Sequence, residues 1–195
     1  CAEFILDEDG KKMSKSKGNG ILAMELLDKF GADATRLFFY STAAWKPKPL
    51  VEKVVKELET KILGTLLNMY SFFSSNANLD GYQHHGLLKS NNLLDKWLLS
   101  RINTTVANVT KAMDSYEFHD AQRLISDLIE QTSNVYLRLS RRRFWDPSDS
   151  IEEKNAAYSV LFHALEVICR LLAPIAPFTT EFVYRNLMGG NESVH

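Results

Sequence analysis

Two long stretches of this sequence carry apolar residues at alternating spacings of three and four, and this pattern limits the possible fold most strongly. Such spacing places side chains along one face of an α-helix. The first stretch contains Leu94, Leu98, Ile102, Val106, Val109, Met113 and Tyr116, and the second contains Phe118, Ala121, Ile125, Leu128, Thr132, Val135 and Leu139. Both stretches therefore predict long amphipathic helices whose apolar faces pack against other helices.

The segments on either side are also predicted to be helical. The chain from Val51 to about Ser74 is amphipathic and is interrupted only by Gly64. Residues 78–92 form a polar connector, in which we expect His84 and His85 to be solvated. No strand alternation appears after residue 10. The pattern indicates a mainly α fold built as an antiparallel helix bundle.

The last third of the chain carries clear start and stop signals for helices. Ser150 followed by Glu153 is a capping box, which predicts a helix to about Leu172. Pro177 then begins a short helix over 178–187. The two glycines at 189–190 end that helix.

The amino-terminal part has a different character. Phe4 to Leu6 predicts a short strand, and a helix over 21–30 ends at Gly31, where a left-handed cap is expected. A second helix is expected from Ala34 to about Thr42. We therefore divide the chain into a short appendage (1–45), a helical domain (46–188) and a truncated connector (189–195). Both ends read as cuts, so we expect a fragment of a longer protein.

Composition excludes several classes of protein. The formal net charge is −1, from 23 basic and 24 acidic residues, so any surface for a polyanion must be local. The two cysteines, Cys1 and Cys169, exclude a disulfide framework and a thiolate zinc site. No uncharged apolar run reaches about 18 residues, and no signal peptide is evident. We expect a cytoplasmic protein with no metal site in this chain and no membrane partner.

A lysine-rich loop over residues 11–20 carries the clearest chemical signal. Lysine ammonium groups and serine hydroxyls suit a phosphate chain, although the order differs from that of a P-loop. The run Lys12-Met13-Ser14-Lys15-Ser16 resembles the KMSKS signature of class I aminoacyl-tRNA synthetases, and the match extends over Leu6 to Asn19. The resemblance implies an ATP site, with Lys15 as the main contact, Lys12 as a second cation, and Ser14 and Ser16 as supporting donors.

Two further segments resemble the same family. Gly31 to Arg36 is similar to the small helical motif that follows the loop and supports the tRNA, although the residues alone predict only a helix–turn–helix. The run Tyr136 to Trp145 resembles the isoleucyl branch, as do Asp95 to Arg101 and Ala176 to Thr179. Together these matches span nearly the whole chain.

The resemblance assigns tRNA contacts to four arginines, Arg138, Arg141, Arg142 and Arg143. By helical spacing the first three share a face while Arg143 points elsewhere. The alternative is that the arginines bridge to nearby carboxylates. We expect Phe144 and Trp145 to fill the core, with stacking on RNA as their alternative role.

The resemblance implies part of an isoleucine–tRNA ligase with a class Ia anticodon-binding bundle. Its expected partners are isoleucine tRNA, ATP with Mg²⁺ in the parent enzyme, and L-isoleucine bound outside this chain. We expect a monomeric parent. Open alternatives are a valyl or leucyl relative, a non-catalytic tRNA-binding module, and a helical interaction domain. The His-x-Gly-His signature, the amino-acid pocket and the editing insertion are absent, so we expect this chain alone to be inactive.

Overall fold

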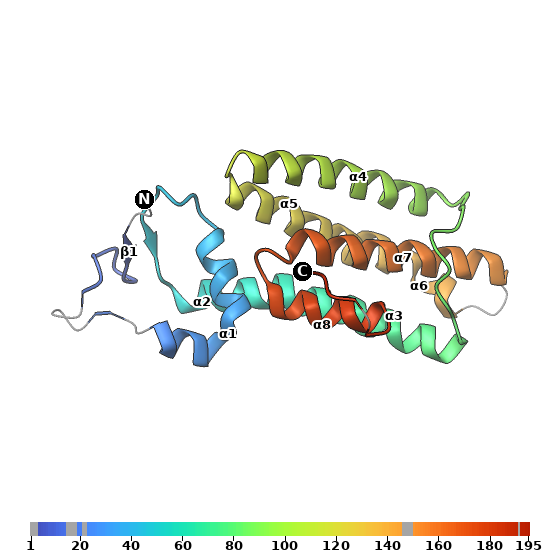
Figure 1. Cartoon of the computed structure of the whole chain (residues 1–195), viewed down its shortest axis with the longest axis horizontal. Coiled ribbons are helices and arrows are strands. Elements are labelled where there is room, and N and C mark those ends of the chain that lie inside the picture. The colour runs from blue at the N-terminus through green and yellow to red at the C-terminus, as the bar shows by residue number, and fades with distance from the viewer. Residues whose placement is uncertain (1–3, 15–18, 21–22, 146–149, 191) are drawn as a thin grey trace.

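The computed structural model describes residues 4–14, 19–20, 23–145, 150–190 and 192–195. Figure 1 shows an elongated molecule in which a bundle of roughly parallel and antiparallel helices occupies one end and a small appendage the other. The mainly α fold predicted from the sequence is confirmed.

The helical bundle is built from these elements in chain order: α2 (Glu52–Leu58), η2 (Glu59–Gly64), α3 (Thr65–Asp80), α4 (Leu93–Asp114), α5 (Phe118–Gln131), η3 (Thr132–Leu137), α6 (Arg138–Trp145), α7 (Ile151–Leu172) and α8 (Pro177–Leu187). The segments η2 and η3 are π-helical turns inside otherwise continuous helices. The interruption predicted at Gly64 is thus a change of winding, since the helix passes from η2 directly into α3.

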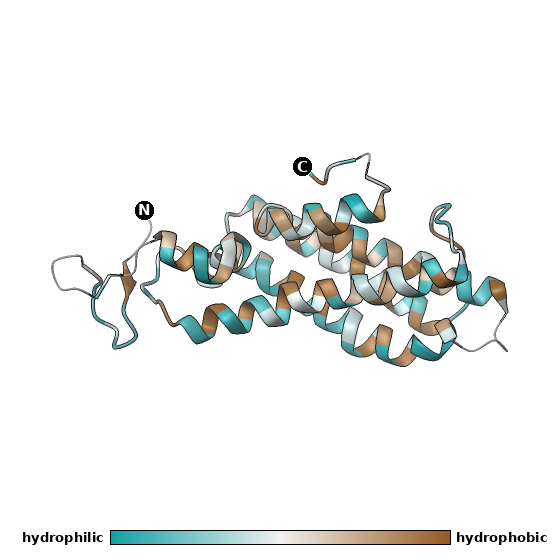
Figure 2. Cartoon of the chain, turned by 90° about the horizontal axis from the view of Figure 1, so that it is seen from below, coloured by the Kyte–Doolittle hydropathy of each residue, from teal (hydrophilic) through white to brown (hydrophobic). Residues whose placement is uncertain are grey.

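The core of the bundle lies around α7. This helix contacts α3, α4, α5, α6 and α8, and most of its side chains from Ala156 to Leu172 are buried. Figure 2 shows hydrophobic and hydrophilic residues alternating around the surrounding helices. Among the described helices, α7 is the one with the length and apolar composition to cross a membrane, but 67% of its apolar window is buried inside the bundle. Its hydropathy is that of a central packing helix.

The start of α7 follows the sequence prediction in part. Ser150 Oγ accepts a hydrogen bond from the Glu153 amide at 3.1 Å, which caps the helix. The Glu153 carboxylate, which a full capping box would return to Ser150, contacts Arg143 at 3.3 Å. The predicted Ser150 cap is confirmed, while the Glu153 side chain contacts Arg143 of α6.

The appendage consists of two short strands and a kinked helix. Strand β1 (Ile5–Leu6) pairs in parallel with β2 (Lys48–Pro49). Helix α1 (Ala23–Tyr40) is broken at Gly31, where φ is 78° and ψ is 167°. The break at Gly31 is confirmed, but its backbone is extended with positive φ and is not a left-handed helical cap.

The expectation of no strand beyond residue 10 is wrong. The β2 strand, which lies just after our predicted domain boundary at residue 46, pairs with β1 of the appendage. The Lys48 ammonium group fixes this strand to the end of α1, because it donates to the carbonyl oxygens of Phe38 and Phe39. Burial lowers the pKa of Lys48 to about 8.

Candidate functional site

The two ends of the lysine loop are held together by the side chain of Asn19. Its Oδ1 accepts a hydrogen bond from the Ser14 amide at 3.0 Å. Its Nδ2 donates to Asp7 Oδ2 at 2.8 Å and to the Lys12 carbonyl oxygen at 3.4 Å. One amide side chain therefore closes the base of the loop from both sides.

Asp7 is the acceptor that fixes this closure. The hydrogen bond from Asn19, followed by that from the Lys11 amide at 2.7 Å, lowers the pKa of Asp7. The carboxylate therefore stays ionised at neutral pH and keeps accepting from both donors. The Asp7 side chain thus joins the turn over residues 7–10 to the lysine loop.

The predicted ATP residues are described only in part. Lys12 places its ammonium nitrogen 3.7 Å from the centroid of the Phe4 ring, a cation–π contact. Ser14 lies at the closed base of the loop. Lys15 and Ser16 lie outside the described residues. Sequence reasoning missed the role of Asn19, although an asparagine between two glycines is the kind of residue that forms such local bonds.

The segment Gly31 to Arg36 ties the appendage to the bundle. The Asp33 carboxylate accepts hydrogen bonds from the amides of Phe178 (3.3 Å) and Thr179 (2.6 Å) at the start of α8. Arg36 donates to the carbonyl oxygens of Pro174 (2.7 Å) and Ile175 (2.8 Å). A buried carboxylate thus satisfies free amides at a helix N-terminus. The polar side chains of this motif clamp α1 against the α7–α8 turn.

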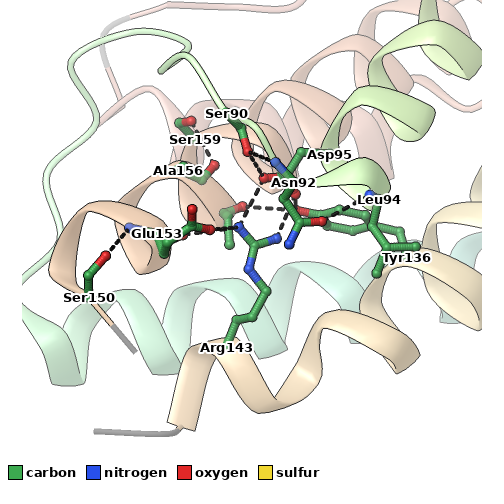
Figure 3. Close-up of polar contacts among 11 residues, drawn as sticks. Ser90, Asn92, Leu94, Asp95, Tyr136, Arg143, Ser150, Glu153, Ala156 and Ser159 are labelled. Atoms are coloured by element: carbon green, nitrogen blue, oxygen red, sulfur yellow. Dashed lines mark hydrogen bonds and ion pairs between the residues drawn. The ribbon is translucent and has the colours of Figure 1, made fainter. Parts of the chain in front are cut away.

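The four arginines of α6 divide into two groups. Arg138, Arg141 and Arg142 are exposed, whereas the side chain of Arg143 is 11% exposed and points into the bundle (Figure 3). The expectation that Arg143 faces away from the other three is confirmed. Because Arg143 is engaged with Asp95 inside the protein, we keep only Arg138, Arg141 and Arg142 as candidate RNA contacts.

Arg143 binds a buried carboxylate from α4. Its Nη1 and Nη2 donate to Asp95 Oδ1 and Oδ2 at 2.7 and 2.9 Å, a bidentate ion pair. Ser90 and Tyr136 donate to the same carboxylate at 2.5 and 2.8 Å. The arginine also reaches the Glu153 carbonyl oxygen at 3.1 Å. Figure 3 shows these groups converging from the connector, α4, η3, α6 and α7.

The charges of this network are stabilised by one another. Burial alone would raise the pKa of Asp95, but hydrogen bonds from Arg143, Ser90 and Tyr136 outweigh it, so the pKa is lowered. Burial, followed by the charge of Asp95, raises the pKa of Tyr136. Asp95 is therefore an anion and Tyr136 a neutral donor at neutral pH.

The two aromatic residues at the end of α6 have different environments. Phe144 is buried, as expected, but Trp145 is 58% exposed, so the expectation that it fills the core is wrong. The Trp145 indole donates to Asn76 Oδ1 at 2.9 Å, which holds the exposed ring in place. The guanidinium carbon of Arg141 lies 5.5 Å from the centroids of both Phe72 and Trp145. Trp145 and the exposed arginines thus form one surface.

The surroundings of His84 and His119 could not be predicted from the sequence. The His84 ring stacks on Phe162 with 3.6 Å between centroids, so the expectation that it is solvated is wrong. Among the described residues, Glu117, His119 and Asp120 place potential metal ligands within 4.8 Å of one another. Asp120 is already paired with Arg123 at 2.9 Å, so this cluster is accounted for as an ion-pair group.

A family match covers more than half of the chain. Residues 95–195 match the family described as the anticodon-binding domain of tRNA ligase. The chain belongs to that family. Residues 1–48 match the family described as class I tRNA synthetases for I, L, M and V, so the second match ends at β2. The first match covers the bundle from Asp95 in α4 onward, and the second covers the appendage as far as Lys48.

Curated relatives are similar over nearly the whole chain. The isoleucine–tRNA ligase of Picrophilus torridus is 50% identical over 191 residues, that of Thermoplasma volcanium 48% over 192, and that of Bacillus thuringiensis strain Al Hakam 44% over 193. Each alignment covers 98% of this chain. The chain spans only 18–19% of the length of these relatives.

Solved structures share the fold at low sequence identity. The LeuRS–tRNA–LeuAMS ternary complex of Agrobacterium radiobacter K84 aligns with a TM-score of 0.78 and 21% identity, over 99% of this chain and 23% of that one. The methionyl-tRNA synthetase of Mycobacterium tuberculosis bound by methionyl-adenylate gives 0.76 and 21%, over 92% and 36%. These likenesses establish the arrangement of the helices.

Proposed function

We propose that this chain is the part of an isoleucine–tRNA ligase that carries the ATP loop and the tRNA-binding helix bundle. Support comes from relatives of that name at 44–50% identity and from the matching anticodon-binding family. The same support favours isoleucine over the valine and leucine alternatives. The parent would be a cytoplasmic monomer.

The observation that carries the RNA-binding part is the exposed basic face of α6. Arg138, Arg141 and Arg142 project to solvent there, beside the fixed ring of Trp145. Guanidinium groups bind phosphate in a fork, and an exposed indole offers a stacking surface for an unpaired base. This local cluster overcomes the near-zero net charge of the chain, and we propose that it binds the anticodon stem-loop.

The loop would act on the leaving group of ATP. In adenylate formation a carboxylate oxygen of isoleucine bonds to the α-phosphorus while the bond to pyrophosphate breaks. Negative charge grows on the departing oxygens, and Lys12 and Lys15 would neutralise it with hydrogen bonds from Ser14 and Ser16. These donors fit a polyphosphate. We place the Mg²⁺ that accompanies ATP, and the isoleucine pocket, in the remainder of the ligase.

The RNA-binding proposal is tested by the salt dependence of tRNA affinity. A labelled isoleucine tRNA transcript is titrated with the chain at several salt concentrations, and the affinity should fall steeply as salt rises. The R138A/R141A/R142A variant should lose most of this affinity while its circular dichroism stays unchanged. Equal affinity of the variant and the wild type would refute the proposed face. Competition by valine and leucine tRNAs tests the amino-acid assignment.

The loop proposal is tested by isoleucine-dependent pyrophosphate exchange. The chain alone should show none, whereas the full-length ligase should be active. In that ligase, Asn19→Ala should slow exchange about tenfold by opening the base of the loop, without weakening tRNA binding. Robust exchange by the chain alone would contradict this division of roles.

A further inference from the structure

The Asp95 carboxylate holds two residues of one continuous helix. Tyr136 in η3 and Arg143 in α6 both donate to its Oδ1, at 2.8 and 2.7 Å. Residues seven apart lie on the same side of a helix, two turns from each other. The carboxylate is itself fixed by Ser90 at 2.5 Å. A single group on α4 therefore fixes this helix at two points along its length.

The rotation of α6 decides which arginine faces solvent. Each residue of an α-helix turns by about 100° relative to its neighbour. With Arg143 turned inward, Arg142 lies about 100° away and Arg141 about 200° away, on the solvent side. Arg138 falls within the same outward sector. A rotation by one residue would bring Arg142 to the core and expose Phe144.

The segment before α6 is wound differently from α5 and α6. Residues Thr132–Leu137 form a π-helical turn, which is wider than an α-helical turn. The phase of α5 is therefore not carried unchanged into α6. An anchor on each side of the junction between η3 and α6 would set the phase, and Tyr136 and Arg143 lie on those two sides.

An ion pair is better suited than an apolar contact to setting the rotation of α6. A buried ion pair contributes little net stability compared with well-packed apolar residues. Its forked geometry, however, fixes direction, because both guanidinium nitrogens must meet both carboxylate oxygens. The side chains of Asp95 and Arg143 are 0% and 11% exposed, so solvent does not loosen the pair.

We propose that Asp95 is a positioning residue for RNA recognition: by holding Arg143 and Tyr136 it sets the rotation of α6 that presents Arg138, Arg141 and Arg142. The proposal rests on the proposed function of the α6 face. Asp95 is fully buried, so it would not itself touch RNA. A variant that removes the ion pair without changing the net charge distinguishes this positioning role from a purely structural one.

The test uses D95N/R143M, which keeps the net charge and fills the site with groups of similar size. Its matched control is D120N/R123M, which removes an ion pair on α5 without touching α6. Labelled isoleucine tRNA is titrated at several salt concentrations, and folding is followed by thermal melting. We expect D95N/R143M to melt close to the wild type but to bind at least about fivefold more weakly, with a smaller salt slope. The control should bind as the wild type does.

Other outcomes are equally decisive. Wild-type tRNA affinity in a folded D95N/R143M would overturn the positioning role of Asp95. If R138A/R141A/R142A then still lost binding, the proposed RNA-binding function of the α6 face would stand. Should D95N/R143M not fold, Asp95→Glu keeps the charge and lengthens the arm by one methylene. Weaker binding by folded D95E supports positioning, and unchanged binding refutes it. A wild-type chain that binds no tRNA would refute the proposed function itself.

Discussion

Replacing Arg143 by Met is the sharpest test of the buried network. The substitution removes both hydrogen bonds that the guanidinium makes to Asp95, at 2.7 and 2.9 Å. It leaves a fully buried carboxylate with Ser90 and Tyr136 as its remaining donors among the described residues. The variant therefore isolates the cost of an uncompensated buried charge.

The magnitude follows from that burial. Removing one partner of a buried ion pair typically costs about 3–5 kcal/mol. For a chain of this length each 1 kcal/mol lowers the melting temperature by about 2–4 °C, so Arg143→Met should lower it by about 6–20 °C. Adding Asp95→Asn should restore most of the loss, since no unpaired charge then remains buried at this site.

The pH dependence gives an independent signature. In the wild type the pKa of Asp95 is lowered, so its contribution to stability is present at neutral pH and is lost as the pH falls through the folded-state pKa, below 3.8. In Arg143→Met burial is no longer outweighed, and the pKa of Asp95 rises above the unfolded-state value. The folded variant then takes up a proton before the unfolded chain does, so acidification from pH 7 towards 4 should reduce its deficit.

The assay is urea unfolding of wild type, Arg143→Met, Asp95→Asn and the double variant at pH 7, 5.5 and 4.5. We expect a large coupling energy between Asp95 and Arg143 at pH 7, and we expect it to decrease as the pH falls. A loss below about 1 kcal/mol for Arg143→Met at pH 7, or a deficit that grows as pH falls, would show that an uncompensated buried charge is not what destabilises the variant.

Three further predictions concern other parts of the fold. Burial lowers the pKa of Lys48 to about 8, so between about pH 8 and 10.5 the unfolded chain holds a proton that the folded chain has lost. The free energy of unfolding, measured with urea, should therefore rise over that pH window, and Lys48→Met should abolish the rise. Phe144→Ala should cost about 3–5 kcal/mol in the same assay, whereas Trp145→Ala, at an exposed site, should cost less than about 1 kcal/mol and weaken tRNA binding. Asp33→Ala should cost about 1–2 kcal/mol by leaving the amides of α8 without their acceptor, and should speed amide exchange at Thr179.

The long helices could be predicted because their signal is local. Apolar residues repeat every three or four positions within each helix, and Ser150 marks a helix start through a bond that spans three residues. The break at Gly31 follows from the positive φ that glycine adopts readily. Each of these features depends on residues that are neighbours in the sequence.

The features that could not be predicted depend on distant partners. The β2 strand is two residues long and exists through its pairing with β1, more than forty residues earlier. Asp95 reads as a surface charge until Arg143, 48 positions later, is placed beside it. Trp145 follows buried Phe144, but one helical step of about 100° turns it to solvent. The periodicity of apolar residues predicts the buried face of a helix, but the last buried residue of that face depends on the neighbouring helices.

Site-specific crosslinking probes directly whether the exposed face of α6 binds the anticodon stem-loop. A photoreactive residue is placed at Leu139, which is 62% exposed on α6 among the arginines, and separately at Phe178, which is 69% exposed on α8. With isoleucine tRNA bound, we expect crosslinks from position 139 to the anticodon stem-loop and none to that stem-loop from position 178. Crosslinks to the stem-loop from position 178 alone would contradict it.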